Sequence, residues 1–266
     1  MTKEKQPYGT VLIKAAKILD FLSESKKPQP LNVIAQETGM TSSTTLKILE
    51  TLVIIGYAKK YPETKRFGLG TSLIYYANQY LANLDITKIT FPYLQKLQSN
   101  LDETVHLGIL EEDKIFYINK LEPERPIIRM SSRIGMSIPL YCSAMGKAVL
   151  AEFSQQDLES YLTRVELNPV NENTIIDPHV LKETLKEIKQ IGFAIDDAEY
   201  EEEVYCIGVS LTLNGQTYGA FSVSMPKYRV TEDLKKKMIQ LILETKQNKI
   251  FSMNLNNCMC SYRNSF

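Results

Sequence analysis

Two short amphipathic runs near the N-terminus are separated by a glycine. The first, residues 31–37, places its apolar side chains on one helical face. The second repeats core-forming residues at i, i+3, i+4 and i+7, which makes one buried stripe on a helix. These residues are Thr45, Ile48, Leu49 and Leu52. Gly39 can adopt the left-handed conformation that a sharp turn requires, and Thr41 or Ser42 can cap the second helix. The pattern therefore predicts a helix-turn-helix.

The face opposite this stripe is narrow and mostly polar. It carries hydroxyl groups and one lysine, but no His, Cys or paired carboxylates that a hydrolytic or metal site would need. A slim helix of this composition suits the major groove, where hydroxyls and a lysine can meet base edges and phosphates. The residues that we expect to contact DNA here are Ser42, Ser43, Thr44, Leu46 and Lys47.

A short basic hairpin is predicted directly after the second helix. Residues 57–61 and 65–69 have the composition of two strands, with Pro-Glu-Thr as the turn between them. Four cations on this segment could reach DNA phosphates. They are Lys59, Lys60, Lys65 and Arg66. Helix, turn, helix and basic hairpin in this order are typical of a winged helix. The alternative is a surface helical hairpin followed by a solvated basic loop.

Three further helices are predicted in the first hundred residues. Residues 10–25 would pack on the winged-helix core. Residues 70–84 have an apolar face and three tyrosines, which suit a linker helix that also forms a helix–helix interface. A wholly intramolecular core role is the alternative for that helix. Residues 91–101 form another helix, with Pro92 in the first turn, where a missing N–H costs nothing.

From about residue 103 the hydrophobic period changes from helical to alternating. Strands are predicted at 105–109, 115–118, 127–130, 193–195, 206–213 and 218–224. Helices are predicted to begin near Ser143 and to cover 155–163, 178–192 and 230–249. We expect an α+β domain whose sheet is covered by helices on one side. The whole chain would then be an α/β multidomain protein with a winged helix at 8–70, a linker helix at 71–88, the α+β domain at 89–250 and a tail at 251–266.

Composition describes an ordinary globular protein, with 44% hydrophobic and 23% charged residues among 266. The net charge of zero conceals an asymmetry, because residues 1–84 hold 11 Lys and Arg against 6 Asp and Glu. A basic excess on the predicted winged helix fits a nucleic-acid module, and its modest size suggests that two copies act together. We expect a cytoplasmic protein without membrane spans, since the four cysteines do not form a secreted disulfide framework and no apolar run approaches ~20 residues.

Three blocks of sequence resemble the IclR-type bacterial transcriptional regulators. They are IAQETGMTSSTT from residue 34, IGMSIP and SAMGKA from residues 134 and 143, and GFAIDD and GAFSVSMP from residues 192 and 219. The resemblance covers nearly the whole chain. It implies a GAF-like effector-binding domain after the winged helix, homodimers through the N-terminal module and often homotetramers. Many members have Pro and a basic residue where Thr41 and Ser42 stand, and a polar residue at Leu46, which could instead meet a thymine methyl group.

The second domain offers a candidate ligand site. A helix that begins at Ser143 presents unpaired N–H groups, which can hold a small carboxylate. The resemblance places the effector-contacting turn at Ala144 and Met145. It places the other contacts and the apolar walls at Asp196, Cys206, Ser222, Ser224, Met130, Ile138 and Val204. We therefore expect a repressor of double-stranded operator DNA that responds to a small acid such as a keto acid or sugar acid.

Two other classes remain open. An enzyme could use Cys206, Asp196 or Ser222, but neither His106 nor His179 is near a nucleophile motif, and we interpret both as structural. Gly146-Lys147 matches only part of a phosphate-binding loop. The remaining cysteines, Cys258 and Cys260, lack further metal ligands, so we expect neither metal nor cofactor. A redox sensor through Cys142 or Cys206 is the third class.

Overall fold

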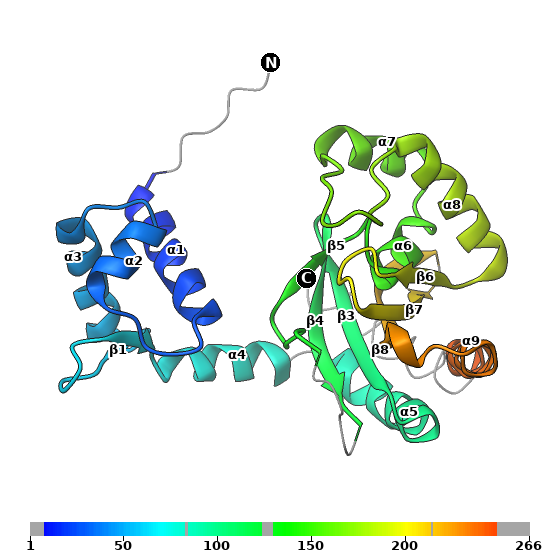
Figure 1. Cartoon of the computed structure of the whole chain (residues 1–266), viewed down its shortest axis with the longest axis horizontal. Coiled ribbons are helices and arrows are strands. Elements are labelled where there is room, and N and C mark those ends of the chain that lie inside the picture. The colour runs from blue at the N-terminus through cyan, green and yellow to red at the C-terminus, as the bar shows by residue number, and fades with distance from the viewer. Residues whose placement is uncertain (1–7, 83–84, 124–129, 214, 249–266) are drawn as a thin grey trace. The chain divides into compact units, whose positions relative to one another are not determined.

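The computed structural model describes residues 8–82, 85–123, 130–213 and 215–248. The chain folds into two compact units that divide between residues 83 and 84 (Figure 1). Each unit has a hydrophobic core of its own.

The N-terminal unit is a winged helix followed by one further helix. Its elements are α1 (Thr10–Glu24), α2 (Leu31–Glu37), α3 (Ser42–Ile54), β1 (Ala58–Lys60), β2 (Phe67–Leu69) and α4 (Ser72–Ala82). The predicted turn is confirmed, because Gly39 has a φ of 67°. The predicted cap is also confirmed, since the Thr41 hydroxyl accepts a hydrogen bond from the backbone N–H of Thr44 at 3.3 Å. The predicted stripe on α3 is buried, and its aliphatic members pack with Ile18 and Phe67.

Helix α4 has a broad apolar face that is exposed. The exposed fractions of Ile74, Tyr75 and Tyr76 are 60%, 64% and 55%. The ring of Tyr76 meets that of Tyr57 edge-on, with centroids 5.6 Å apart, so α4 packs against the winged helix through this residue. A wholly intramolecular core role is therefore wrong for these three side chains. Exposed aromatic side chains of this kind are typical of a surface that meets a partner.

The C-terminal unit is built on a six-stranded antiparallel sheet with the order β5-β4-β3-β8-β7-β6. The strands are β3 (Thr104–Glu111), β4 (Lys114–Leu121), β5 (Ser137–Pro139), β6 (Ala194–Asp197), β7 (Val204–Leu213) and β8 (Gln216–Pro226). The helices are α5 (Asp85–Leu101), α6 (Ala144–Leu150), α7 (Gln155–Arg164), α8 (Pro178–Ile191) and α9 (Glu232–Gln247), and a 3-10 turn spans Lys227–Arg229.

Helices cover both faces of this sheet, so the expectation of one covered face is wrong. Along β7, Ile207 and Val209 alternate with Gly208 and Ser210, and all four are buried. Helices α6 to α8 lie on one side of the strands, and α5 and α9 lie on the other (Figure 1). The second face carries small or polar residues such as Gly208 and Ser210, so the strand alternates like one with a solvated face, and the sequence therefore predicted only one layer of helices.

Three local expectations change. Helix α5 begins at Asp85, so Pro92 lies in its interior and not in a first turn. Burial of Ile86 and Thr90 explains the extra turns, because packing outweighs the weak helix propensity of this stretch. Most of the predicted strand 127–130 lies outside the described residues, and Met130 is in no regular element. Strand β5 was expected to be loop, and it pairs Ile138 with Ile115.

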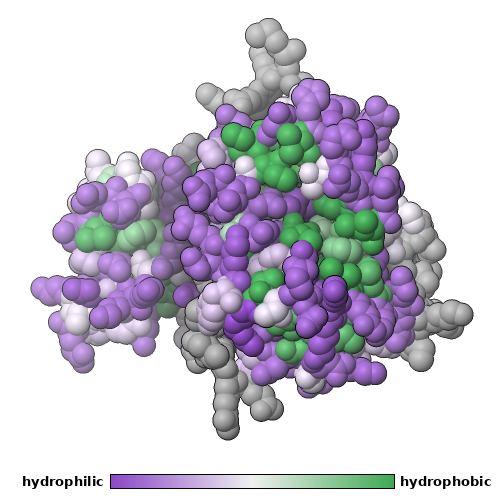
Figure 2. Space-filling model, turned by 45° about the vertical axis from the view of Figure 1, so that its right-hand side comes forward, coloured by the Kyte–Doolittle hydropathy of each residue, from purple (hydrophilic) through white to green (hydrophobic). Residues whose placement is uncertain are grey.

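The surface in Figure 2 is mostly hydrophilic, with hydrophobic groups in separate patches between polar ones. Within the described ranges, the helices are too short or too polar to cross a bilayer.

Candidate functional site

The exposed face of α3 is the first candidate surface. Ser42, Ser43 and Lys47 are exposed, whereas Thr44 is half-buried and its backbone N–H donates to the Thr41 cap. Leu46 departs from the expected exposure, since it is half-buried and packs against the winged-helix core. Only part of its side chain could reach a base. The helix thus presents hydroxyls and one ammonium group to solvent, which suits contact with base edges and phosphates.

The basic hairpin lies beside this helix in sequence, and all four of its predicted cations are exposed. The ammonium of Lys59 lies 5.2 Å from the centroid of the Tyr61 ring, and that of Lys60 lies 5.6 Å from the Phe67 ring. Arg66 donates a hydrogen bond to the backbone oxygen of Pro28 at 3.2 Å. These contacts hold the cations on the hairpin while leaving their charges open to solvent.

The second candidate site begins with a polar row across three strands of the C-terminal sheet. Asp196 on β6 pairs in register with Cys206 on β7, and Cys206 pairs with Ser224 on β8. Cross-strand neighbours point to the same face. The sheet register therefore places a carboxyl, a thiol and a hydroxyl side by side.

A second row lies two residues further along each strand, on the same face. Gly208 pairs with Ser222, and Ser222 pairs with His106 on β3. A Cβ atom on Gly208 would lie 2.6–2.8 Å from backbone atoms of Ala144 and Met145. Glycine at this position therefore lets the start of α6 lie directly on the sheet, next to both polar rows.

The start of α6 is capped by its own chain. The Ser143 hydroxyl accepts from the backbone N–H of Gly146 at 3.1 Å and donates to the backbone oxygen of Pro139 at 2.8 Å. The helix has seven residues, all buried. A bound anion would therefore rely on neighbouring side chains as well as on this helix.

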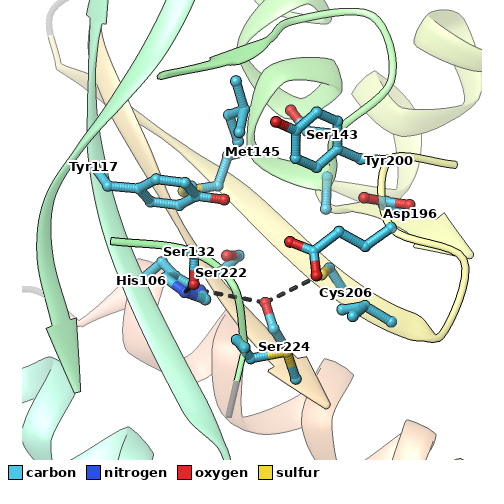
Figure 3. Close-up of a pocket in the computed structure, with 15 residues that line it drawn as sticks. His106, Tyr117, Ser132, Ser143, Met145, Asp196, Tyr200, Cys206, Ser222 and Ser224 are labelled. Carbon is cyan, nitrogen blue, oxygen red and sulfur yellow. Dashed lines mark hydrogen bonds between the residues drawn. The ribbon is translucent and has the colours of Figure 1, made fainter. Parts of the chain in front are cut away.

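Together these elements line one pocket, whose space, including its mouth to solvent, is about 420 Å³ (Figure 3). All ten predicted residues, nine from the resemblance and Ser143 from the helix start, are among those lining it: Met130, Ile138, Ser143, Ala144, Met145, Asp196, Val204, Cys206, Ser222 and Ser224. Five further residues line the pocket and were not predicted: His106, Tyr117, Ser132, Tyr200 and Glu201. That these residues bind a ligand stays a prediction.

His106 joins the pocket through a chain of hydrogen bonds. Its Nε2 lies 2.8 Å from the hydroxyl of Ser132, and its Nδ1 lies 3.3 Å from the hydroxyl of Ser224. The Cys206 thiol in turn contacts the Ser224 hydroxyl at 3.1 Å. The ring is buried, and burial lowers its pKa to about 3, helped by the nearby charge of Lys120. The imidazole is therefore neutral at physiological pH.

Asp196 lies across the pocket from His106 in Figure 3. Burial raises its pKa to about 7, although a hydrogen bond from the Glu199 backbone N–H at 2.7 Å opposes the rise. Behind it, Lys147 and Glu199 form a buried ion pair. A carboxyl with this pKa can take a proton near neutral pH, and it can then donate to an anionic ligand.

The chemistry of these groups does not favour catalysis or redox sensing. A nucleophilic cysteine needs a thiolate and a base, but burial raises the pKa of Cys142 to about 12 and raises that of Cys206 well above its usual range. His106, with its lowered pKa, is a poor base. Among the described residues there is also no group of three or more His, Cys, Asp or Glu that could hold a metal ion. The pocket is suited to binding.

Comparisons with known proteins decide the family. The model of the IclR helix-turn-helix domain matches residues 11–62, and that of the bacterial transcriptional regulator IclR C-terminal domain matches residues 78–249. The chain belongs to the IclR family. As a member of this family it is a transcriptional regulator with an N-terminal helix-turn-helix domain and a C-terminal α/β domain.

The similarity to relatives extends over nearly the whole chain. The DNA-binding transcriptional repressor YiaJ of Escherichia coli K12 is 31% identical over 93% of this chain and 89% of its own. The crystal structure of the Thermotoga maritima IclR is 32% identical with a TM-score of 0.74, over 93% of this chain and 99% of that one. An IclR homologue of Microbacterium hydrocarbonoxydans, solved in complex with 4-hydroxybenzoate, has the same fold at 19% identity, with a TM-score of 0.75 over 93% and 99%.

Proposed function

We propose that this IclR-family regulator is a repressor whose binding to operator DNA is modulated by a small carboxylic acid in the pocket of the C-terminal unit. The single observation that carries the ligand proposal is the convergence of a carboxyl, a thiol, an imidazole and several hydroxyls from separate elements on one pocket. A small number of polar groups that converge in a mostly apolar pocket is typical of a small-molecule site.

The comparisons support the parts of this proposal unequally. The relative from Escherichia coli is named a repressor, which supports the sign of regulation. The Microbacterium homologue binds 4-hydroxybenzoate, a small carboxylic acid, which supports the ligand class. A keto acid or sugar acid fits the hydroxyl-rich rows equally well, since such ligands offer both donors and acceptors. In this proposal the DNA contacts are the exposed residues of α3 and the basic hairpin.

Assembly is part of the same proposal. The exposed aromatic face of α4 is suited to a second copy of this chain, and two winged helices would double a basic excess that is modest in one. We propose a homodimer through this face, or a homotetramer that also uses the C-terminal units. Because its target is operator DNA, we place the protein in the cytoplasm.

A thermal-shift screen of keto acids, sugar acids and aromatic acids tests the ligand proposal. A ligand that binds only the folded state raises the melting temperature by mass action. At a ligand concentration of one hundred times its Kd, the free energy of unfolding rises by ~2.7 kcal/mol. A hit should also change DNA affinity in a mobility-shift assay. If no acid shifts the melting temperature while mild peroxide abolishes DNA binding and thiol restores it, the redox alternative replaces this one.

A further inference from the structure

His106 and Ser132 are not explained by packing alone. His106 is 3% exposed on the central strand β3, on the sheet face that also carries Ser222, while its neighbours Val105 and Leu107 are buried on the opposite face. A core position of this kind favours an aliphatic side chain, since a buried polar ring must find partners for both nitrogens. Here the partners are Ser132 and Ser224, and all three side chains line the pocket.

The four residues of this chain of hydrogen bonds carry more polar hydrogens than the contacts among them use. Cys206, Ser224, the neutral ring of His106 and Ser132 each carry one polar hydrogen, which makes four. The chain itself contains three contacts, from Cys206 to Ser224, from Ser224 to His106 and from His106 to Ser132. Whichever tautomer the ring adopts, one hydrogen is left over for an acceptor outside the four residues. Because all four line the pocket, a bound molecule can supply that acceptor.

The left-over donor belongs to an uncharged group. The imidazole is neutral and the Cys206 thiol is protonated, so the chain offers a hydrogen bond without a positive charge. Lys120 is the cation beside it, but its ammonium is 3.1 Å from Glu122 and donates to the backbone oxygens of Ser132 and Met130. A ketone or hydroxyl oxygen is satisfied by one neutral donor, whereas a buried carboxylate would need a counter-charge.

We propose that Ser132 and His106 are specificity-determining residues of the pocket, which read an uncharged oxygen of the effector, either a ketone carbonyl or a hydroxyl. This inference rests on the proposed function, because it assumes that the pocket binds a small acid. It adds that the acid carries a second, uncharged oxygen, and that the residues selecting for it are these two. In this proposal the ring hydrogen lies on Nε2, so that Cys206 donates to Ser224, Ser224 donates to Nδ1 and Nε2–H donates to Ser132, which leaves the hydroxyl hydrogen of Ser132 for the ligand.

The test compares acids that differ only in this oxygen. Propionate, lactate and pyruvate share three carbons and a carboxylate, and they carry no oxygen, a hydroxyl and a ketone at the second carbon. Benzoate and 4-hydroxybenzoate form a second such pair. Isothermal titration of the full-length chain should show at least one oxygenated acid binding about tenfold more tightly than its plain counterpart, which corresponds to one well-formed hydrogen bond.

The variants are Ser132→Ala and His106→Phe, with Ser137→Ala on β5 as the matched control. In both pocket variants the ratio of the affinities for the oxygenated and the plain acid should fall to about twofold or less. The control should keep the full preference. A general structural defect would weaken all acids alike and would not change the ratio. Should His106→Phe fail to fold, Ser132→Ala, which removes one hydroxyl, decides the question.

Two failures are distinguishable. If the wild type binds neither the five acids nor any acid of the thermal-shift screen, the small-acid site of the proposed function is wrong, and this inference fails with it. If the wild type binds them but without preference, or if both variants keep the tenfold preference, the site stands and the role of Ser132 and His106 is overturned.

Discussion

At the scale of single residues, the most informative group is Asp196, a carboxyl that the fold keeps away from water. Its raised pKa is a cost that the folded state bears at neutral pH, because a charged carboxylate there has lost most of its hydration. Such perturbed groups in a concave site are candidates for function and not for stability. The same residue therefore supplies both a test of stability and a test of regulation.

Replacing Asp196 with Asn should stabilise the protein at alkaline pH. Because the pKa of Asp196 is about 7 when folded and ~3.9 when unfolded, the folded state holds a proton that the unfolded state releases between about pH 4 and 7. The wild-type unfolding free energy should therefore lose a contribution as pH rises through this window. The variant has no such proton, so at pH 8 it should be more stable than the wild type, by an amount on the order of 1–4 kcal/mol.

Urea unfolding of both proteins at pH 4, 6 and 8 measures this difference. The advantage of the variant should shrink toward zero as pH falls to 4. Other titrating groups, Glu199 included, act in both proteins and cancel to first order in the comparison. A difference that does not change with pH would show that Asp196 is not the group concerned.

At the scale of elements, the site depends on how closely α6 can approach the sheet, and Gly208 permits that approach. Substituting Gly208 with Ala should destabilise the C-terminal unit by roughly 1–3 kcal/mol, because the new methyl group would overlap the backbone at the start of α6. It should also lower affinity for any pocket ligand. Gly68→Ala is the control, since its Cβ would meet only side-chain atoms at 3.4 Å or more. Equal melting temperatures for the two variants would contradict this account.

The exposed cations of the winged helix lead to a separate prediction about DNA affinity. Lys47→Ala, Lys59→Ala and Arg66→Ala should each weaken DNA binding, because a cation on a phosphate releases counterions. Each should also reduce the slope of log affinity against log salt by ~0.9. Lys189→Ala, an exposed lysine on α8, is the control with the same charge change. Fluorescence anisotropy at four salt concentrations measures affinity and slope. If all three variants match the control, the proposed DNA surface is wrong.

Sequence predicted the elements wherever local signals were strong. The Gly39 turn and the Thr41 cap were both identified, because each depends on the backbone conformation of only one or two residues. Strand β5 and the true start of α5 were missed. Both depend on pairing or burial against distant segments, which no local period reveals.

The residues that line the pocket likewise include some that the sequence predicted and some that it did not. Nine lining residues could be named through the family resemblance, because that resemblance carries positions from solved folds onto this chain, and Ser143 could be named from the predicted helix start. His106 was read as structural, and the only signal against that reading was a lone polar residue inside an apolar strand. Ser132, Tyr200 and Glu201 lie outside the strands and helices, so their place at the pocket follows from the path of the chain and from no periodicity.

At the scale of the whole molecule, two units with opposite charge balance share one chain. The basic excess lies in residues 1–84, and the remaining residues carry the acidic excess. The covalent path between the units runs through α4 and the two residues that follow it. A ligand in the second unit can alter DNA affinity only if it binds two arrangements of the assembly with different affinity.

We predict that the effector repositions the paired winged helices through α4, and that it changes the preferred half-site spacing while leaving the recognition surface of α3 unchanged. Coupling of this kind is typically ~1–3 kcal/mol, which is roughly a 5–150-fold change in affinity. Asp196→Ala should abolish the response to effector and leave effector-free DNA binding intact, because Asp196 lines the pocket and lies outside the winged helix. Anisotropy with operators of varied half-site spacing, with and without effector, measures both effects. A variant that responds with wild-type potency would show that the effector binds elsewhere, and a response that is equal for every spacing would contradict repositioning.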